Sequence, residues 1–241
     1  MKTLVLGDTH GHNSWKEILE KETFDKVIML GDYVDSFTLK PKEIADNLLD
    51  IIKTKEKLGD KMVLIYGNHD HSYYSNERCS GWNIDGYYMY SPLLEDMMKE
   101  NMLELIHIQD DIIFSHAGVS DYWMREVCGF NDVSDITFDK ILEYPLGLSC
   151  LDWNMFKGYN GYGDTISQSP IWIRPKSLLE SKVDGYRQVV GHTHFRTPVE
   201  EQGIYFNDMM PHHYIVVEYG DIKFVEYDSS RNKIKKDTNI L

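Results

Sequence analysis

The feature of this sequence that most constrains its fold is a phrase that recurs five times: a short apolar run, a small residue, and then carboxylate, amide or imidazole side chains. The five copies are LVLGDTHGH (4–12), VIMLGDYVD (27–35), VLIYGNHDH (63–71), IIFSHAG (112–118) and VVGHTH (189–194). Short apolar runs bounded by turn residues predict buried strands. Ligands of open α/β sheets bind beyond the carboxyl ends of the strands, so we expect the five polar segments to meet in one crevice.

Each copy taken alone has a simpler explanation. A single Gly-Asp pair is usually a turn or a helix cap, and a single strand histidine is usually a structural side chain. However, five of the ten histidines follow these strands, interleaved with Asp and Asn. Their joint occurrence favours a shared site over five unrelated turns.

The first half of the chain alternates these strands with helical patterns over 13–22, 40–59 and 91–101, which is typical of βαβ units. After residue 102 we expect two strands around a turn at 109–111 and a late hairpin through Gly220 and Asp221. The sequence therefore predicts one α/β domain over 1–241 with a mixed sheet, in which 118–185 is a loop-rich insert or lid.

Composition limits the function classes. The formal charge is −14, and the one basic cluster, 231–236, lies at the end of the chain, which disfavours a nucleic-acid footprint. Apolar runs reach only about six residues, far below the roughly 20 of a membrane span, so we expect no membrane partner and a cytoplasmic location. Cys79, Cys128 and Cys150 are widely spaced, and we expect reduced thiols.

The ligand types indicate the chemistry. Imidazole, carboxylate and amide oxygen together suit Mn, Fe, Zn or Co better than calcium. Seven such side chains exceed the three or four protein ligands of one catalytic metal, whereas a two-metal site with a bridging carboxylate accommodates them. Such a site makes hydroxide at neutral pH and neutralises a phosphoryl group, so the sequence predicts metal-assisted hydrolysis of phosphoesters.

The same residues resemble a known family. The blocks D-x-H, G-D-x-x-D, G-N-H-[DE], a lone His and G-H-x-H occur in this order over residues 8–194, as in the calcineurin-like metallophosphoesterases. The resemblance implies a four-layer α/β fold, a double β-sheet sandwich flanked by helices, with two divalent transition-metal ions at one edge. Mn is the first expectation, and Fe, Zn, Co and Ni remain open.

The resemblance also implies roles for the individual residues. One ion would take Asp8, His10, Asp32 and His194, and the other Asp32, Asn68, His116 and His192, with Asp32 bridging and Asn68 also contacting substrate. His69 would protonate the leaving oxygen, and Asp35 would orient it, since a carboxylate fixes the tautomer of such a histidine.

GDYVD and SHAG are most similar to the phosphoprotein-phosphatase branch of the family and its dinucleoside-tetraphosphatase relatives. That branch has arginines where this chain has Ser36 and Tyr66. Bidentate arginine clamps are hard to replace, so these departures argue against a phosphoprotein substrate. Arg174, in SPIWIRP (169–175), resembles a Trp-x-Arg segment of bacterial relatives and is the candidate phosphate contact. The alternative for Arg174 is packing beside Trp172 or pairing with a surface acid.

We therefore expect a phosphoesterase that acts on a phosphorylated small molecule, either a phosphomonoester or a nucleotide. Aromatic residues at Tyr159, Tyr162 and 81–90 weakly favour a nucleotide, although core packing is the commoner role of such residues. The alternatives are a Ser/Thr phosphoprotein phosphatase, a non-catalytic protein-binding scaffold, and a nuclease or nucleic-acid-end phosphatase. The sequence makes no prediction of oligomeric state.

Overall fold

Two β-sheets stacked on one another form the centre of the molecule in this computed structural model, which describes residues 1–75, 77–153 and 164–227. The first sheet has the strand order β11-β10-β1-β2-β3-β4. Its parallel strands are β1 (Lys2–Leu6), β2 (Lys26–Met29), β3 (Met62–Ile65) and β4 (Leu103–Glu104). The antiparallel edge is formed by β10 (His213–Glu218) and β11 (Asp221–Glu226).

The second sheet has the order β5-β6-β7-β9-β8. Its parallel centre is β6 (Ile112–Ser115), β7 (Arg187–His194) and β9 (Ile204–Asp208). The antiparallel edges are β5 (Ile106–Gln109) and β8 (Val199–Glu201). In both sheets the parallel strands run side by side, so polar segments that follow them are delivered to the same edge.

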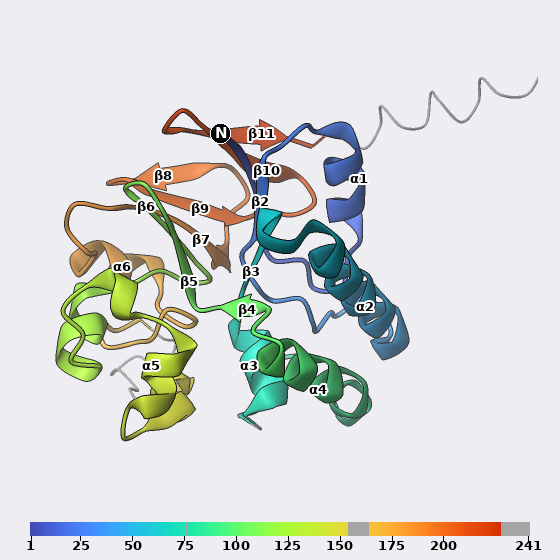
Figure 1. Cartoon of the computed structure of the whole chain (residues 1–241), viewed down its shortest axis with the longest axis horizontal. Coiled ribbons are helices and arrows are strands. Elements are labelled where there is room, and N and C mark those ends of the chain that lie inside the picture. The colour runs from blue at the N-terminus through green and yellow to red at the C-terminus, as the bar shows by residue number, and fades with distance from the viewer. Residues whose placement is uncertain (76, 154–163, 228–241) are drawn as a thin grey trace, which may run out of the picture.

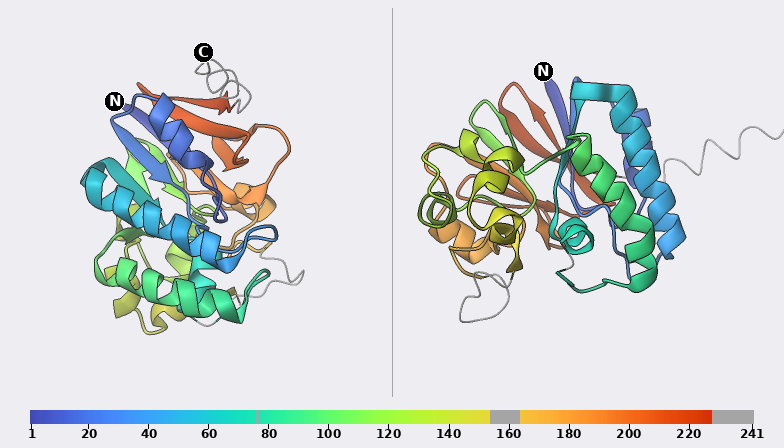
Figure 2. Two further views of the ribbon diagram at one scale, coloured as in Figure 1. Left: turned by 90° about the vertical axis from the view of Figure 1, so that its right-hand side faces the viewer. Right: turned by 60° about the horizontal axis from the view of Figure 1, so that its bottom comes forward.

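Helices cover the outer faces of both sheets. Figures 1 and 2 show α1 (Ser14–Lys21), α2 (Pro41–Leu58) and α4 (Ile84–Lys99) together on one side, and α5 (Phe138–Glu143) and α6 (Pro175–Glu180) on the other. α3 (Asn68–Tyr74) follows β3 directly. Short helical turns complete the chain: Gly59–Lys61, Trp123–Val127, Val133–Asp135 and Gly147–Leu151.

The alternation of side chains along the strands explains the layers. In β1, Val5 points between the sheets, where it packs with Ile28, Phe114 and Val189. Its neighbours Leu4 and Leu6 point outward into the cluster that also holds the apolar stripe of α2. Strands apolar on both faces are expected for a sheet covered on both sides. Each such buried side chain contributes about 1.5–3 kcal/mol relative to exposure.

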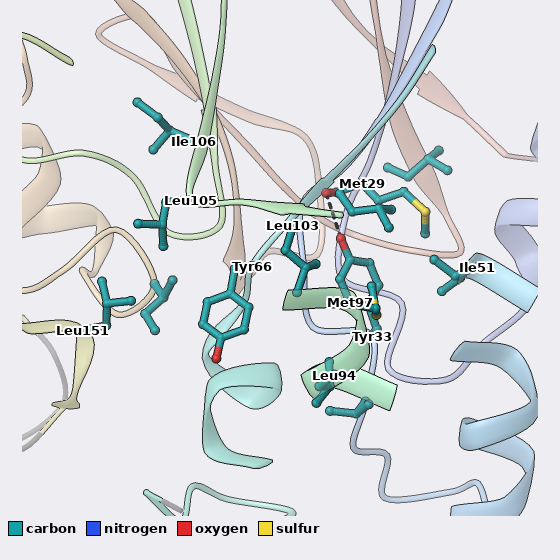
Figure 3. Packing of buried hydrophobic residues seen from close by; sticks show 14 of the residues in the cluster. Met29, Tyr33, Ile51, Tyr66, Leu94, Met97, Leu103, Leu105, Ile106 and Leu151 are labelled. Atoms are coloured by element: carbon teal, nitrogen blue, oxygen red, sulfur yellow. Dashed lines mark hydrogen bonds between the residues drawn. The ribbon is translucent and has the colours of Figure 1, made fainter. Parts of the chain in front are cut away.

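Tyr33, shortly after β2, and Tyr66, directly after β3, are fully buried in the apolar cluster on the outer face of the first sheet. The Tyr33 hydroxyl donates to the carbonyl of Ile65 at 2.8 Å. It also approaches the carbonyl of Met29, the contact marked in Figure 3. Tyr66 points between Leu105 and α3 in the same view. The loops that carry the polar segments are therefore anchored in the core.

The predicted four-layer α/β sandwich flanked by helices is confirmed, and the single mixed sheet read from strand order alone is wrong. The chain leaves the first sheet at β4, and Leu105, buried and in neither strand, separates β4 from β5 in the second. Consequently 102–116 forms three short strands and not two.

Two element boundaries also differ from expectation. The helix expected over 91–101 begins at Ile84, because the Asn83 side chain caps it by accepting the Gly86 amide at 2.7 Å. The late hairpin turns at Tyr219 and Gly220, both with positive φ, and Asp221 already belongs to β11.

The described residues of segment 118–185 form α5, α6 and three short helical turns. Residues 154–163, with Tyr159 and Tyr162, fall outside the described part, as does the basic cluster 231–236. Of the helices in the described ranges, none has the length and apolar character needed to cross a bilayer.

Candidate metal centre and active site

The polar segments predicted to converge do so at one edge of the two sheets. Five strands, β1, β2, β3, β6 and β7, each end beside the same cavity of about 380 Å³. Its lining includes Asp8, His10, Asp32, Asn68, His69, Arg174 and His192. His116 lies fully buried behind it, and His194 lines an adjoining cavity together with Asp8 and His10.

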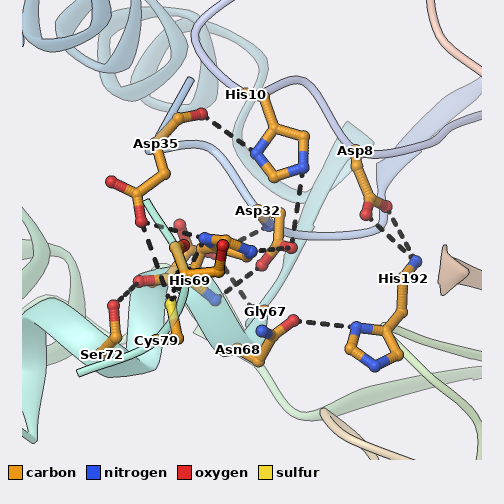
Figure 4. A network of polar contacts seen from close by, with 12 residues as sticks. Asp8, His10, Asp32, Asp35, Gly67, Asn68, His69, Ser72, Cys79 and His192 are labelled. Carbon is orange, nitrogen blue, oxygen red and sulfur yellow. Dashed lines mark hydrogen bonds and ion pairs between the residues drawn. The ribbon is translucent and has the colours of Figure 1, made fainter. Parts of the chain in front are cut away.

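One group of atoms that could bind a metal ion centres on His116 and His192. Nε2 of His116 and Nδ1 of His192 lie 3.2 Å apart, and Asn68 Oδ1 lies 2.8 Å and 2.9 Å from them. Asp32 Oδ2 lies 3.4 Å from the same His116 nitrogen. Figure 4 shows His192 and Asn68 pointing toward one another from different segments.

The second nitrogen of each ring fixes its tautomer. His116 Nδ1 lies 2.8 Å from the carbonyl of Leu30, and His192 Nε2 lies 3.2 Å from that of Trp172. A carbonyl can only accept, so these nitrogens carry the protons and the two that face each other are bare. Burial lowers the pKa of both rings, and the Arg174 charge adds to the effect at His192. The two bare nitrogens point at one another and at the Asn68 and Asp32 oxygens. A divalent cation between them would bind all four of these atoms.

A second group of possible metal-binding side chains lies on the other side of Asp32. His10 Nδ1 donates to the carbonyls of Val34 and Asp35, both at 3.1 Å, so its Nε2 is free to face Asp32 Oδ2 at 4.0 Å. Asp8 is buried beside them. His194 stands at the rim, its side chain 63% exposed, with Nδ1 3.8 Å from Asp208 Oδ2.

Three carboxylates therefore crowd this second group. Burial raises the pKa of Asp8 well above its usual value, and the charges of Asp208 and Asp32 raise it further. Burial likewise raises the pKa of Asp208. The pKa of Asp32 is lowered, because the imidazoles of His116, His69 and His10 together outweigh its burial. Clustered, desolvated carboxylates of this kind are stabilised by a cation.

His69 and Asp35 form a hydrogen-bonded pair at the cavity wall. His69 Nδ1 lies 2.9 Å from Asp35 Oδ2, and its Nε2 faces Asp32 Oδ2 at 3.9 Å. The hydroxyl of Tyr73 donates to the other Asp35 oxygen. Burial would lower the pKa of His69, but the charge of Asp32 and the Asp35 hydrogen bond raise it well above the usual value.

Backbone conformation at the site is unusual. His10, Asp32, Asp35 and His192 all have positive φ, between 45° and 63°. Left-handed backbone costs a non-glycine residue about 1–2 kcal/mol, so the surroundings must hold it. Asp70 supplies part of that support, since its carboxylate accepts the amides of Asp32, Tyr33 and Gly67 at 2.9–3.1 Å. Asp70 thus supports the loop and lies behind the site.

Arg174 stands at the cavity wall just before α6. Its Nη1 donates to Thr193 Oγ1 at 3.1 Å and approaches the His192 carbonyl at 3.4 Å. These contacts hold the guanidinium against β7, in the cavity that His192 also lines.

Ser36 and Tyr66, the two positions that depart from the family pattern, make structural hydrogen bonds. The Ser36 hydroxyl accepts the amides of Thr38 and Leu39 in its own turn. The Tyr66 hydroxyl meets His71 Nδ1 at 3.2 Å, and the other nitrogen of that ring lies 2.6 Å from Asp152. Position 66 therefore faces the core and offers nothing to a phosphate.

The sequence analysis missed several residues at the site, among them Asp208, Arg78, Cys79 and Trp153. Asp208 ends β9 directly opposite His194, so the strand 204–208 also brings a carboxylate to this edge. Arg78 and Cys79 line the cavity from the loop between α3 and α4. No periodic pattern marks a loop residue, whereas Asp208 could have been found from the apolar run before it.

Comparison with known proteins now decides the family. Residues 1–196 of the 241 match the calcineurin-like phosphoesterase family. The chain belongs to the calcineurin-like phosphoesterases. Members of this metallophosphoesterase family use divalent metals, and the described residues include clusters that could hold them, among them Asp32, His116 and His192. The predicted family is confirmed.

A symmetrical bis(5'-nucleosyl)-tetraphosphatase of Buchnera aphidicola subsp. Baizongia pistaciae (strain Bp) is 28% identical over 136 residues, which are 51% of this chain and 46% of that protein. The alignment thus spans less than half of that relative.

Solved structures support the fold. A mutant of a cold-active protein tyrosine phosphatase has a TM-score of 0.63 at 16% identity, covering 94% of this chain and 78% of its own. A protein serine/threonine phosphatase of Saccharomyces cerevisiae has a TM-score of 0.59 at 17% identity, covering 95% and 81%. At these identities the likeness concerns the fold alone.

Proposed function

We propose that this chain is a metal-dependent phosphoesterase that hydrolyses a phosphomonoester or a nucleotide-type phosphoester. The observation that carries the proposal is the pair of bare nitrogens of His116 and His192, 3.2 Å apart, at the cavity that His192 and His69 line, with Asp35 hydrogen-bonded to His69. Two divalent ions bound there would acidify water and neutralise charge on a phosphoryl group. The remaining tasks fall to the side chains of this chain.

In the proposed site, Asp8, His10, Asp32 and His194 hold one ion, and Asp32, Asn68, His116 and His192 hold the other. Asp32 serves both, because it lies between the two groups and within 4.0 Å of His10 and 3.4 Å of His116. Mn is the ion that we would supply first, since histidine and carboxylate sites of this type accept it.

His69 is the proposed general acid. Asp35 fixes the proton on Nδ1, so Nε2 faces the cavity, and the charge of Asp32 and the Asp35 hydrogen bond raise the pKa of the ring. From that position Nε2 can give its proton to the leaving oxygen. Because Nε2 also lies 3.9 Å from Asp32, an alternative role for His69 is that of a ligand.

Arg174 is the proposed phosphate contact, with the Asn68 amide as a second. Thr193 and the His192 carbonyl pre-orient the guanidinium, which reduces the entropy lost when it binds a phosphate. A nucleotide-type substrate is favoured by two tryptophans, Trp153 and Trp172, that line the cavity with ring centroids 5.3 Å apart. The Buchnera relative, whose name denotes a dinucleoside tetraphosphatase, agrees with this choice.

The experiment is a panel of phosphomonoesters, phosphodiesters, dinucleoside polyphosphates and phosphopeptides, each assayed with the metal-free and the Mn-loaded protein. We expect Mn-dependent hydrolysis of a monoester or a nucleotide substrate. Preference for phosphopeptides would support the Ser/Thr phosphatase alternative, and inactivity on the whole panel would support the non-catalytic scaffold.

His69→Ala separates the two roles of that residue. As the acid, it should leave metal content near wild type while lowering turnover of alkyl phosphates far more than that of aryl phosphates, whose leaving groups need no proton. Loss of one ion per chain would assign His69 as a ligand.

A further inference from the structure

Cys79 sits directly against the pair formed by His69 and Asp35. Its Sγ lies 3.4 Å from His69 Nδ1 and 4.0 Å from Asp35 Oδ2, and those two atoms are 2.9 Å apart. Figure 4 shows the sulfur beside the imidazole, on the side away from His192. Of the three cysteines, Cys128 and Cys150 are buried, and only Cys79 is partly exposed.

We propose that Cys79 Sγ, His69 Nδ1 and Asp35 Oδ2 form a third metal site, selective for thiophilic ions such as Zn²⁺ and separate from the two sites described above. One thiolate, one imidazole and one carboxylate, with the fourth position open to the cavity, make a tetrahedral zinc site. The catalytic groups contain no sulfur, so preference for a soft ion distinguishes this site from them.

The spacing of the three atoms fits such an ion. Ligands at ordinary zinc distances around a tetrahedral ion lie about 3.3–3.6 Å apart. The observed separations of 2.9, 3.4 and 4.0 Å reach these values with shifts of roughly half an ångström. Tyr73 holds Asp35 by the other oxygen, which leaves Oδ2 directed at the site and supplies the outer support that metal ligands usually have.

Zinc binding at this site has a defined proton balance. The ion replaces the proton on His69 Nδ1 and the thiol proton of Cys79, and both are released to solvent. The His69 ring then carries a proton only on Nε2, like a neutral imidazole, which is a far weaker acid than imidazolium. We therefore expect Zn²⁺ to inhibit by disabling the acid, a consequence that rests on the proposed function, whereas the binding itself does not.

Binding is tested by titrating the metal-free protein with Co²⁺, as a spectroscopic stand-in for zinc. A thiolate-to-cobalt charge-transfer band should appear in the wild type and in Cys128→Ser, and be absent from Cys79→Ser. Because the catalytic groups offer no thiolate, the band reports on Cys79 alone. No band in the folded wild type, or a band that survives Cys79→Ser, would overturn the site.

Inhibition is tested on the Mn-loaded protein by adding Zn²⁺ in the presence of a reductant that does not chelate metals. Hydrolysis of an alkyl phosphate should be inhibited more strongly than that of an aryl phosphate. Cys79→Ser should raise the zinc concentration needed by at least about tenfold, because losing a direct ligand should cost no less than losing an outer-shell partner of a ligand. Equal inhibition of both variants would mean that Zn²⁺ displaces Mn²⁺ instead. If the cobalt band appears but Zn²⁺ inhibits alkyl and aryl phosphate hydrolysis equally, the third metal site stands and the role of His69 as the acid is contradicted.

Discussion

His69 Nδ1 and Asp35 Oδ2 lie 2.9 Å apart at the wall of the cavity, while Tyr73 donates to the second Asp35 oxygen. The imidazole is thereby held in one tautomer, with Nε2 directed toward Asp32 and the cavity. The contact joins residues from two different strand ends, and it links the protonation of the proposed acid to a carboxylate that belongs to neither metal group.

Asp35→Asn tests this link. The Asp35 hydrogen bond raises the pKa of His69, so its loss should lower that pKa and reduce the protonated fraction at neutral pH. The alkaline limb of the kcat/KM profile for an alkyl phosphate should move to lower pH, with turnover at neutral pH reduced by at most about 10²–10⁴-fold, the usual contribution of an acid. Metal content should stay at the wild-type level. An unmoved alkaline limb would separate Asp35 from the acid function.

Asp8→Asn should stabilise the metal-free protein at neutral pH. The pKa of Asp8 is raised in the folded protein, so the folded protein binds more protons at this group than the unfolded chain does. The free energy of unfolding therefore falls as pH rises from the pKa of the unfolded state through that of the folded state. Melting temperatures of both metal-free variants, measured at about pH 5 and about pH 8, should differ most at the higher pH. Mn²⁺ should then raise the melting temperature of the wild type more than that of Asp8→Asn. A less stable metal-free variant at high pH would contradict carboxylate crowding.

Arg174→Ala should chiefly raise KM. A charged hydrogen bond contributes about 1.5–3 kcal/mol, which corresponds to a KM increase of about tenfold to a hundredfold. Arg174→Lys should recover only part of the loss, since an ammonium lacks the bidentate fork. Arg125→Ala is the matched control, because Arg125 pairs with Asp121 on the exposed surface. A KM unchanged from wild type would remove Arg174 from the substrate site.

Gly191→Ala should weaken metal binding without changing any ligand. A Cβ at Gly191 would lie 2.2 Å from Asp8 Oδ1, so the carboxylate must turn away. We expect metal affinity to fall about 10–100-fold, as when a supporting contact is lost. Gly129→Ala is the control: its Cβ would meet nothing within 4 Å, and its positive φ costs only about 1–2 kcal/mol of stability. Equal metal affinity in the two variants would contradict the close approach of β7 to Asp8.

The metal-type residues were predictable from sequence because they obey a simple rule. Asp8, Asp32, Asn68, His116 and His192 each follow an apolar run, and the shared direction of adjacent parallel strands brings them to one edge. The pairing of His69 with Asp35 came from the family resemblance, since no periodicity relates residues 34 positions apart.

Other features depend on tertiary structure and could not be predicted from the sequence. The division into two sheets rests on the short segment at Leu105, which resembles a continuous strand. The inward direction of Tyr66 is set by His71 and the core, not by its place before Gly67. Cys79 and Arg78 reach the cavity from a loop whose path depends on how α3 and α4 pack.

The most direct test of a two-metal phosphoesterase is turnover of an aryl phosphate measured against the number of Mn²⁺ ions bound per chain, starting from metal-free protein. Two donor groups that share Asp32 predict turnover that stays low with one ion and saturates at about two. Full turnover with a single bound ion, or no turnover with two, would contradict the account.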